Sequence, residues 1–220
     1  MIGFITGLAS EADCLAALAD SRVRVAGIGP GNAARCARDL IAMGCTRLIS
    51  FGIAGGLAAD LKPGAIVIAD SVITPDNYKY PTDTMMAVRL LAALPNAVRR
   101  PIAGSDTMIA TPAEKALLAQ RTGASAVDME SHQIVRVAHE AHIGFIALRA
   151  VCDPQRATLP AAARRAIGSD GRPSIRRVLA QLARDPRELP DLIKLGLYSR
   201  AAHESLRGIA PVIAGYEGGL

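Results

Sequence analysis

The chain has 220 residues, half of them hydrophobic, with 3% aromatic residues and no tryptophan. This length fits a single domain with a sizeable core. The core must be built mainly from Ala, Val, Ile and Leu, as is typical of helices packed on a buried sheet. The net charge of +5 invites a nucleic-acid-binding interpretation, but basic and aromatic residues are not interleaved as a base-stacking surface requires. An anionic lipid surface or a phosphate-bearing ligand explains the excess equally well.

Short apolar runs alternate with helical patterns along the chain, which predicts an α/β fold with a mixed sheet flanked by helices. Strands are expected at 2–7, 22–28, 47–51, 65–72, 101–105 and 144–151. Helices are expected at 10–18, 32–43 (capped by Asn32), 84–94, 127–141, 174–183 and 189–206, and one more after the capping residue Thr111.

Between and after these elements, the polar segment 74–84 is expected to be a surface loop. Gly208 and Pro211 are expected to end the regular structure, before a flexible tail. Since no long linker divides the chain, residues 1–183 are expected to form a catalytic domain and residues 184–220 a basic helical extension of the same domain.

The cysteines and the first residues indicate the compartment. The four cysteines have no CxxC or paired spacing, which favours reduced thiols over a disulfide framework or a zinc site. The N-terminus lacks the basic region of a secretory signal, and no apolar run reaches the roughly 18 residues that span a bilayer. We therefore expect a cytoplasmic protein whose basic C-terminal part allows peripheral contact with the inner membrane.

Three features of the sequence carry chemistry. Gly52–Gly56 follows a buried strand, so its backbone can approach a ligand closely, although an ordinary structural turn is the commoner meaning. Asp128 and Glu130 begin the helix expected at 127–141, where plain complementarity to the helix dipole is the simpler explanation. Asp153 follows the apolar strand 144–151. The carboxyl ends of strands are where α/β folds bind ligands, and a helix N-cap is the alternative there.

Taken together, these features resemble the purine nucleoside phosphorylase and methylthioadenosine/S-adenosylhomocysteine nucleosidase family. The matching segments follow the family's order over about residues 1–180. They are Ile2–Gly7, Gly27–Gly29, Gly52–Leu57, Ser105–Asp106, Ala126–Glu130 and Arg149–Asp153. The resemblance implies a three-layer fold with a mixed β-sheet flanked by helices, a site at the strand ends, a small-molecule nucleoside substrate and a homodimer. It implies no metal or organic cofactor, with inorganic phosphate as a candidate co-substrate.

The resemblance also implies roles for individual residues. Glu130 matches the acid that hydrogen-bonds the ribose hydroxyls, with Met129 packing on the sugar, and Asp153 matches the acid that serves the purine N7. The remaining positions expected to bind substrate are Ile28, Gly52, Ile53, Ala54, Gly55, Met108, Ile109 and Cys152. A protonated Asp153 would neutralise charge on the departing purine, which is general-acid help worth about 10²–10⁴-fold and requires a raised pKa. An ionised Glu130 would stabilise positive charge on the ribose.

The attacking group is less clear, because the sequence departs from the family here. The nucleosidases place a water-activating Glu just after the first strand, where this chain has Ala12, with Glu11 one residue earlier. Because one residue is a large angular step on a helix, Glu11 is expected to point elsewhere. The nucleosidases also carry a Ser at the position of Ile53.

The phosphate-binding arginines of the phosphorylases are missing as well. Phosphate would have to be held by the N–H groups of Gly7 and 52–54 and by the hydroxyls of Thr6 or Ser50. Phosphorolysis is favoured, with two alternatives: a hydrolytic nucleosidase, or a nucleoside-binding protein that has lost catalysis. A basic RNA-binding domain would instead show salt-sensitive RNA affinity, which is not expected.

The opening segment 7–12, the loop 27–33 and the basic C-terminal helix resemble the hopanoid-associated phosphorylases. This resemblance implies adenosylhopane as the substrate, with adenine released during hopanoid side-chain synthesis. The C-terminal helix carries an apolar stripe beside basic residues, formed by Leu189, Leu192, Ile193, Leu195, Gly196 and Leu197. Such a helix can lie on an anionic membrane, and packing on the domain or on a dimer partner is an equal alternative. The histidines at 132, 139 and 142 lack an acidic partner at metal-binding spacing and are expected to be structural or solvent-facing.

Overall fold

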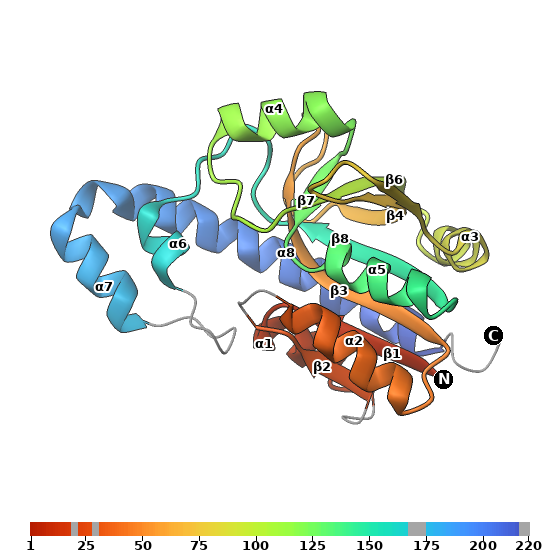
Figure 1. The fold of residues 1–220 in the computed structure, drawn as a ribbon. Helices are drawn as coiled ribbons and strands as arrows, with labels where there is room; N and C mark the ends of the chain where they lie inside the picture. The colour runs from red at the N-terminus through yellow and green to blue at the C-terminus, as the bar shows by residue number, and fades with distance from the viewer. Residues whose placement is uncertain (19–21, 28–30, 167–174, 216–220) are drawn as a thin grey trace.

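The computed structural model describes residues 1–18, 22–27, 31–166 and 175–215. A mixed eight-stranded sheet lies between layers of helices, which confirms the predicted fold class (Figure 1). The strand order is β2-β1-β3-β7-β6-β4-β5, and β8 pairs with both β3 and β4. The strands are β1 (Ile2–Thr6), β2 (Val23–Val25), β3 (Arg47–Gly56), β4 (Ile66–Ile73), β5 (Lys79–Pro81), β6 (Val98–Gly104), β7 (Ala126–Asp128) and β8 (Gly144–Val151).

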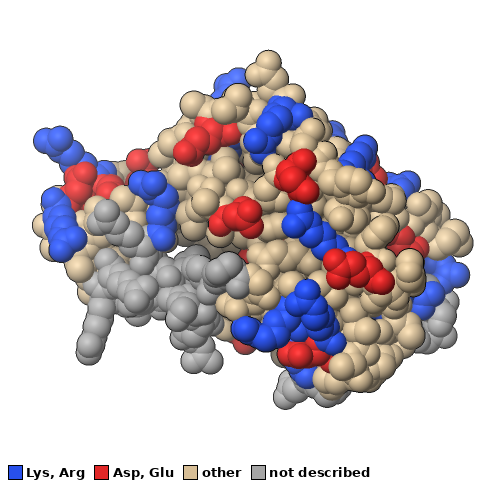
Figure 2. Space-filling model, viewed as in Figure 1, with Lys and Arg blue, Asp and Glu red and all other residues tan. Residues whose placement is uncertain are grey.

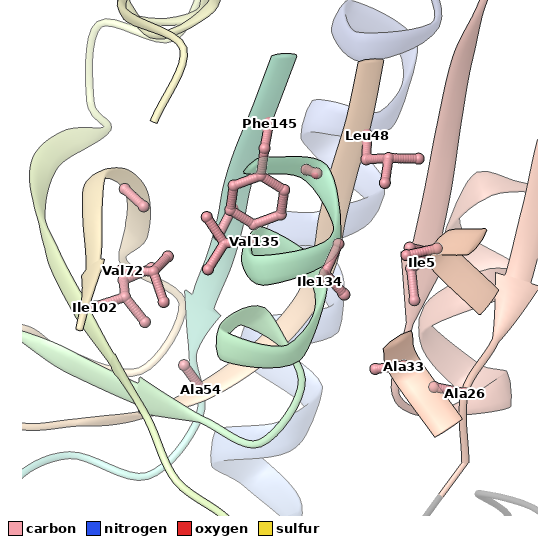
Figure 3. Close-up of a cluster of buried hydrophobic side chains, with 14 of the residues drawn as sticks. Ile5, Ala26, Ala33, Leu48, Ala54, Val72, Ile102, Ile134, Val135 and Phe145 are labelled. Atoms are coloured by element: carbon pink, nitrogen blue, oxygen red, sulfur yellow. The ribbon is translucent and has the colours of Figure 1, made fainter. Parts of the chain in front are cut away.

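The helices cover both faces of the sheet and one of its ends. They are α1 (Ala9–Ala12), α2 (Asn32–Ala42), α3 (Thr84–Ala93), α4 (Pro112–Thr122), α5 (Ser131–Glu140), α6 (Ala161–Ala166), α7 (Ile175–Arg184) and α8 (Leu189–Gly215), with 3₁₀ turns η1 (Asp13–Leu15) and η3 (Pro186–Glu188). Helices α2 and α5 pack on one face, where Leu48, Ile134 and Phe145 belong to one buried cluster (Figure 3). On the other face α8, η1 and α3 bury a second cluster that includes Phe4 and Phe51.

The glycine-rich segment 52–56 is the first departure from the predicted elements. It is not a turn, because β3 continues through it to Gly56. Gly52 pairs in parallel with Arg149 of β8, and Gly55 pairs in antiparallel fashion with Val127 of β7. The helix expected at 127–141 begins only at Ser131, because residues 127 and 128 pair with β3 and β6 as part of β7. The helix expected at 10–18 is split into the short α1 and η1.

Smaller departures have local causes. Gly31, which has a positive φ, is the N-cap of α2, and Asn32 is the first helical residue rather than the cap. The segment 74–84, expected to be a loop, contains the short edge strand β5. The Thr111 cap is confirmed: its hydroxyl accepts the N–H of Glu114, whose carboxylate in turn accepts the N–H of Thr111.

Helix α8 runs past the predicted end at residue 206 and includes Gly208 and Pro211. Leu206, Ile209 and Ile213 on its C-terminal half are buried against the sheet. Tertiary packing of this face therefore outweighs the poor helix propensity of the exposed Gly208. The tail expected to be flexible, residues 216–220, lies outside the described residues.

The first half of α8 behaves differently from the second. Together with α6 and α7 it projects beyond the sheet (Figure 1), and Leu189, Ile193 and Leu197 there are half to two-thirds exposed. Across the face shown in Figure 2, Lys and Arg are interspersed with Asp and Glu rather than gathered in one stripe. No helix in the described ranges is both long enough and apolar enough to cross a membrane.

Candidate functional site

Glu11 is buried at the carboxyl end of β1, against the expectation that it points elsewhere. The chain leaves β1 through Gly7 and enters α1 at once, which places Glu11 in the first turn of the helix. Its Oε2 accepts the N–H groups of Gly7 and Leu8 at 2.8 Å each. Its Oε1 accepts the N–H of Ile53 on β3, also at 2.8 Å. The prediction was wrong because a carboxylate at the third helical position reaches back toward the helix start, as in a capping box.

Three backbone donors and burial act on Glu11 in opposite directions. Burial raises the pKa of the Glu11 carboxyl, while the three N–H groups and the charge of Arg149 lower it, and the net direction is upward. A carboxylate with a raised pKa, and with no ion pair to any of the described residues, accepts a proton more readily than an ordinary Glu.

Arg149 on β8 organises the polar side chains beneath Glu11. Its side chain is fully buried, and Nε donates to Asp128 Oδ2 at 2.6 Å. Nη2 donates to the hydroxyls of Ser50 at 2.6 Å and Ser131 at 2.9 Å. The Ser131 hydroxyl also donates to Asp128, at the point where β7 gives way to α5. Asp128 is therefore part of a buried structural network rather than a simple complement to a helix dipole.

Glu130 is the N-cap residue of α5 and lies beside this network. Its Oε2 accepts only a long 3.3 Å bond, from the N–H of Met129. Burial, together with the nearby charges of Asp128 and Glu11, raises the pKa of Glu130 to about 8, against the opposing effect of Arg149. A neutral Glu130 is thus favoured at pH 7 in the unliganded protein. The expected ionised form requires additional hydrogen-bond donors, such as sugar hydroxyls.

Two glycines make room for the carboxylates. A Cβ at Gly7 would lie 2.6 Å from Glu130 Oε1, and one at Gly52 would lie 2.6 Å from Glu11 Oε1. At Gly55 the nearest atom to a Cβ would be Val127 Cγ1 at 3.3 Å, and Asp153 Oδ2 would be at an ordinary contact distance of 3.4 Å. Gly52 of β3 is therefore needed for close approach, and the group that approaches it is the protein's own Glu11. Gly52 and Gly55 are three residues apart, a span of about 10 Å in a strand.

Asp153 lies two residues after the end of β8 and is 6% exposed. Its backbone carbonyl accepts the N–H of Gly56 at 2.8 Å, which fixes it against the end of β3. Its Oδ2 accepts a 2.5 Å bond from the ammonium of Lys115, a fully buried residue of α4. Burial raises the pKa of the Asp153 carboxyl, and the charge and hydrogen bond of Lys115 hold it down, with a net upward direction. This direction is the one that a general acid requires.

The other residues predicted to bind substrate are placed as follows. Ile53 is half-buried and gives its N–H to Glu11, while Ala54 is buried and its carbonyl accepts the N–H of Cys152. Burial and the neighbouring Asp153 raise the pKa of the buried Cys152 thiol to about 12, so it stays neutral. Met129 is partly buried beside Glu130, and Met108 and Ile109 are partly buried in the connection from β6 to α4. Ile28 lies outside the described residues.

Two cations that balance these acids, Lys115 and Arg149, were not singled out from the sequence. Arg149 belongs to the segment 149–153 that resembles the family, and Lys115 belongs to none of the matching segments. For Lys115 the pattern contained a clue, because it lies three residues before Leu118 on the buried face of α4. Within the described residues, no group of His, Cys, Asp and Glu is arranged to hold a metal ion.

Comparisons with known proteins identify the superfamily and similar folds. The profile of the phosphorylase superfamily matches residues 22–184. Among solved structures, a Helicobacter pylori 5′-methylthioadenosine/S-adenosylhomocysteine nucleosidase is 15% identical with a TM-score of 0.72, covering 100% of this chain and 98% of that chain. The corresponding nucleosidase from Neisseria meningitidis, in complex with methylthio-immucillin-A, is 18% identical with a TM-score of 0.70, covering 96% and 97%. Futalosine hydrolase of H. pylori is 18% identical with a TM-score of 0.61, covering 69% and 87%. No curated protein matches the sequence significantly.

Proposed function

This chain belongs to the phosphorylase superfamily, whose enzymes cleave N-glycosyl bonds, and we propose that it hydrolyses the bond between purine and ribose in an adenosine derivative. The observation that carries the choice of water is the Glu11 carboxylate, seated on the N–H groups of Gly7, Leu8 and Ile53. The names of the two similar nucleosidases, which refer to adenosine compounds, support adenine as the base.

Phosphate would need donors that other groups already use. The N–H groups of Gly7 and Ile53, which phosphorolysis would require, both point at the Glu11 carboxylate. The Ser50 hydroxyl accepts a hydrogen bond from the buried Arg149. A phosphate beside Glu11 would also meet a like charge whenever that carboxyl is ionised. The arrangement therefore supports water as the nucleophile over the phosphorolysis that the sequence favours.

Each carboxylate has a role in the proposed reaction. Glu11 accepts a proton as water oxygen bonds to C1′ of the ribose. The bond from C1′ to the purine nitrogen breaks, its electron pair enters the purine, and Asp153 donates a proton to N7. When the nucleoside binds, Glu130 releases its proton to solvent, accepts hydrogen bonds from the ribose hydroxyls and, as a carboxylate, stabilises positive charge on the sugar. The products are a free sugar and a neutral base.

For the 5′ substituent, adenosylhopane is the specific substrate that we propose. The sequence resemblance implies it, and what supports an apolar substituent is the half-buried Ile53 at a position where the nucleosidases carry a Ser. A substrate panel tests this step separately. The enzyme is incubated with adenosylhopane, methylthioadenosine and S-adenosylhomocysteine, and kcat/KM is compared. Preference for either polar substrate would contradict the assignment of the substituent without affecting the cleavage reaction.

The nucleophile is tested by identifying the sugar product with and without phosphate. We expect the same free sugar in both reactions, and no dependence of rate on phosphate concentration. A sugar 1-phosphate that forms only when phosphate is present would sink the proposal of hydrolysis. Binding of adenine with no turnover of any adenosine derivative would instead identify a catalytically silent binding protein.

Asp153→Asn separates an enzyme from such a binder. The variant keeps the size of the side chain but cannot donate the carboxyl proton. We expect turnover to fall by about 10²–10⁴-fold, while adenine affinity measured by calorimetry changes little. Unchanged turnover would remove Asp153 from the reaction.

A further inference from the structure

Lys115 is a buried cation whose hydrogen bonds all serve the segment that follows β8. Its side chain is 0% exposed. Besides the 2.5 Å bond to Asp153 Oδ2, Nζ donates to the carbonyl oxygens of Pro154 at 2.9 Å and Ala157 at 3.1 Å. A longer fourth contact, at 3.5 Å, goes to the carbonyl oxygen of Asp153 itself, and together these acceptors occupy the three donors of an ammonium group. Lys115 therefore has no donor left for a substrate and can act on the reaction only through Asp153.

The two oxygens of Asp153 are consequently not equivalent. Oδ2 is tied to Lys115, whereas Oδ1 accepts no hydrogen bond from another of the described residues. An Asp side chain has two χ angles, and fixing one oxygen fixes the direction of the other. The anchored carboxyl thus presents Oδ1 as the oxygen free to face a purine nitrogen.

Charge gives Lys115 a second effect on the same group. When Asp153 donates its proton it becomes a buried carboxylate, and the adjacent ammonium compensates that charge. Among the described residues, Lys115 from α4 is the charged group that faces the Asp153 carboxyl, and the neighbouring Cys152 thiol is neutral. The charge of Glu11 acts on that thiol and is not among the charges that act on the Asp153 carboxyl. The proton affinity of Asp153 is therefore set mainly by burial on one side and Lys115 on the other.

We infer that Lys115 is a positioning residue of the glycosidic cleavage: it fixes Oδ2 so that Oδ1 faces the purine, and it makes Asp153 a stronger acid. The inference rests on the proposed function of Asp153 as the proton donor. It predicts that loss of the ammonium leaves Asp153 protonated to a higher pH but less able to give the proton away.

The test compares pH profiles of kcat/KM for the wild type, Lys115→Met and Lys115→Gln. In the wild type the profile falls on the basic side as Asp153 loses its proton. In both variants we expect this limb to move to higher pH by about one to three units, with a lower kcat on the plateau. Lys115→Gln keeps a hydrogen-bond donor, so its loss of kcat should be the smaller one. Arg121→Met removes an exposed cation from the same helix and should leave the limb in place.

A merely structural role for Lys115 would lower activity at every pH without moving the limb, and that result overturns the inference. If Lys115→Met does not fold, the pair Asp153→Asn and Asp153→Asn/Lys115→Met decides, since the double variant leaves no unpaired buried charge. With Asp153 replaced, the inference predicts equal residual kcat in the two proteins. A further loss on removing Lys115 overturns it.

A readout without turnover keeps this inference separate from the proposed function. Infrared spectra of protein with ¹³C-labelled aspartate, with Asp153→Asn subtracted, report the pH at which the Asp153 carboxyl ionises. That pH should be higher in Lys115→Gln than in the wild type, whether or not any nucleoside is cleaved. Equal values overturn the inference, whereas a shift combined with no cleavage would overturn only the proposed function.

Discussion

Glu11 and Asp153 lie near the end of the same strand, β3, and both carboxyls are buried, but their charges are compensated in different ways. Glu11 rests on three backbone N–H groups, and the nearest cation, Arg149, is bonded to Asp128 instead. Asp153 has its own cation, Lys115, at 2.5 Å. Neutral dipoles thus hold one carboxyl, and a full charge holds the other.

The difference separates a proton acceptor from a proton donor. Arg149 must balance Asp128, Glu130 and Glu11 together, so this part of the site favours uptake of a proton. The separate ion pair between Asp153 and Lys115 favours release of a proton. The transferable lesson is that pairs of acids whose surroundings differ in this way take opposite roles in acid–base chemistry.

Glu11→Gln gives the largest expected effect, because it removes the proton acceptor without changing the size of the side chain. We expect kcat to fall by about 10²–10⁴-fold with little change in KM, measured by release of adenine from an adenosine derivative. Asp13→Asn is the matched control, since Asp13 is an exposed acid two residues away. Equal kcat in Glu11→Gln and the wild type would contradict the assigned role and return phosphate to consideration as the nucleophile.

Arg149→Met tests how much the cation shared by several buried acids contributes to the stability of the fold. Removing one partner of a buried ion pair costs about 3–5 kcal/mol, because the remaining charges are left uncompensated. We expect a loss of this size in the free energy of unfolding by urea. Lys115→Met should lower the free energy of unfolding by less, since it leaves a single carboxylate without its cation and that carboxylate can take up a proton. A larger loss of stability for Lys115→Met would show that Lys115, and not Arg149, contributes more to the stability of the fold.

The sheet and most elements follow from the sequence because their patterns are strong and local. Gly144–Val151 is apolar except for Arg149, Thr111–Glu114 is a complete capping box, and both elements are predicted correctly. The wrong predictions concern segments whose secondary structure depends on pairing between strands that are distant in sequence. Nothing local distinguishes residues 52–56 from a turn, or 126–128 from a helix start, because each is a strand only through the other.

The sequence predicts the position of single residues better than the contacts that several residues share. The strand that ends before Asp153 is predicted from its apolar residues, and the role of Asp153 as a proton donor stays a prediction. The orientation of Glu11 is predicted wrongly because a regular helix is expected from residue 10, whereas α1 has only four residues and turns its third side chain back. Lys115 and Arg149 were missed as functional groups because a buried cation has meaning only beside the acids it balances, which lie more than 20 residues away in sequence.

Glu130 predicts how stability depends on pH. Its pKa is about 8 in the folded protein against 4.5 for an ordinary Glu, so between these values the folded state holds a proton that the unfolded state has lost. The stabilising contribution is therefore full below about pH 4.5 and is lost as pH rises toward 8, at up to about 1.4 kcal/mol per pH unit. Urea unfolding across this interval should show a steeper decline for the wild type than for Glu130→Gln. Parallel curves would contradict the raised pKa.

Arg100→Met gives the smallest expected effect and tests whether burial, rather than pairing, creates the costs above. Arg100 makes two hydrogen bonds to Asp60, at 2.9 and 2.7 Å, a geometry as good as that of the buried pairs. Both side chains are solvent-accessible, so water can replace the lost partner and salt already screens the attraction. We expect the midpoint of urea unfolding to stay within measurement error of the wild type, at low and high salt alike. A loss of stability comparable to that of Arg149→Met would mean that ion-pair geometry alone is stabilising. Desolvation would then not explain the contrast between Arg149, which several acids share, and Lys115, which pairs with Asp153.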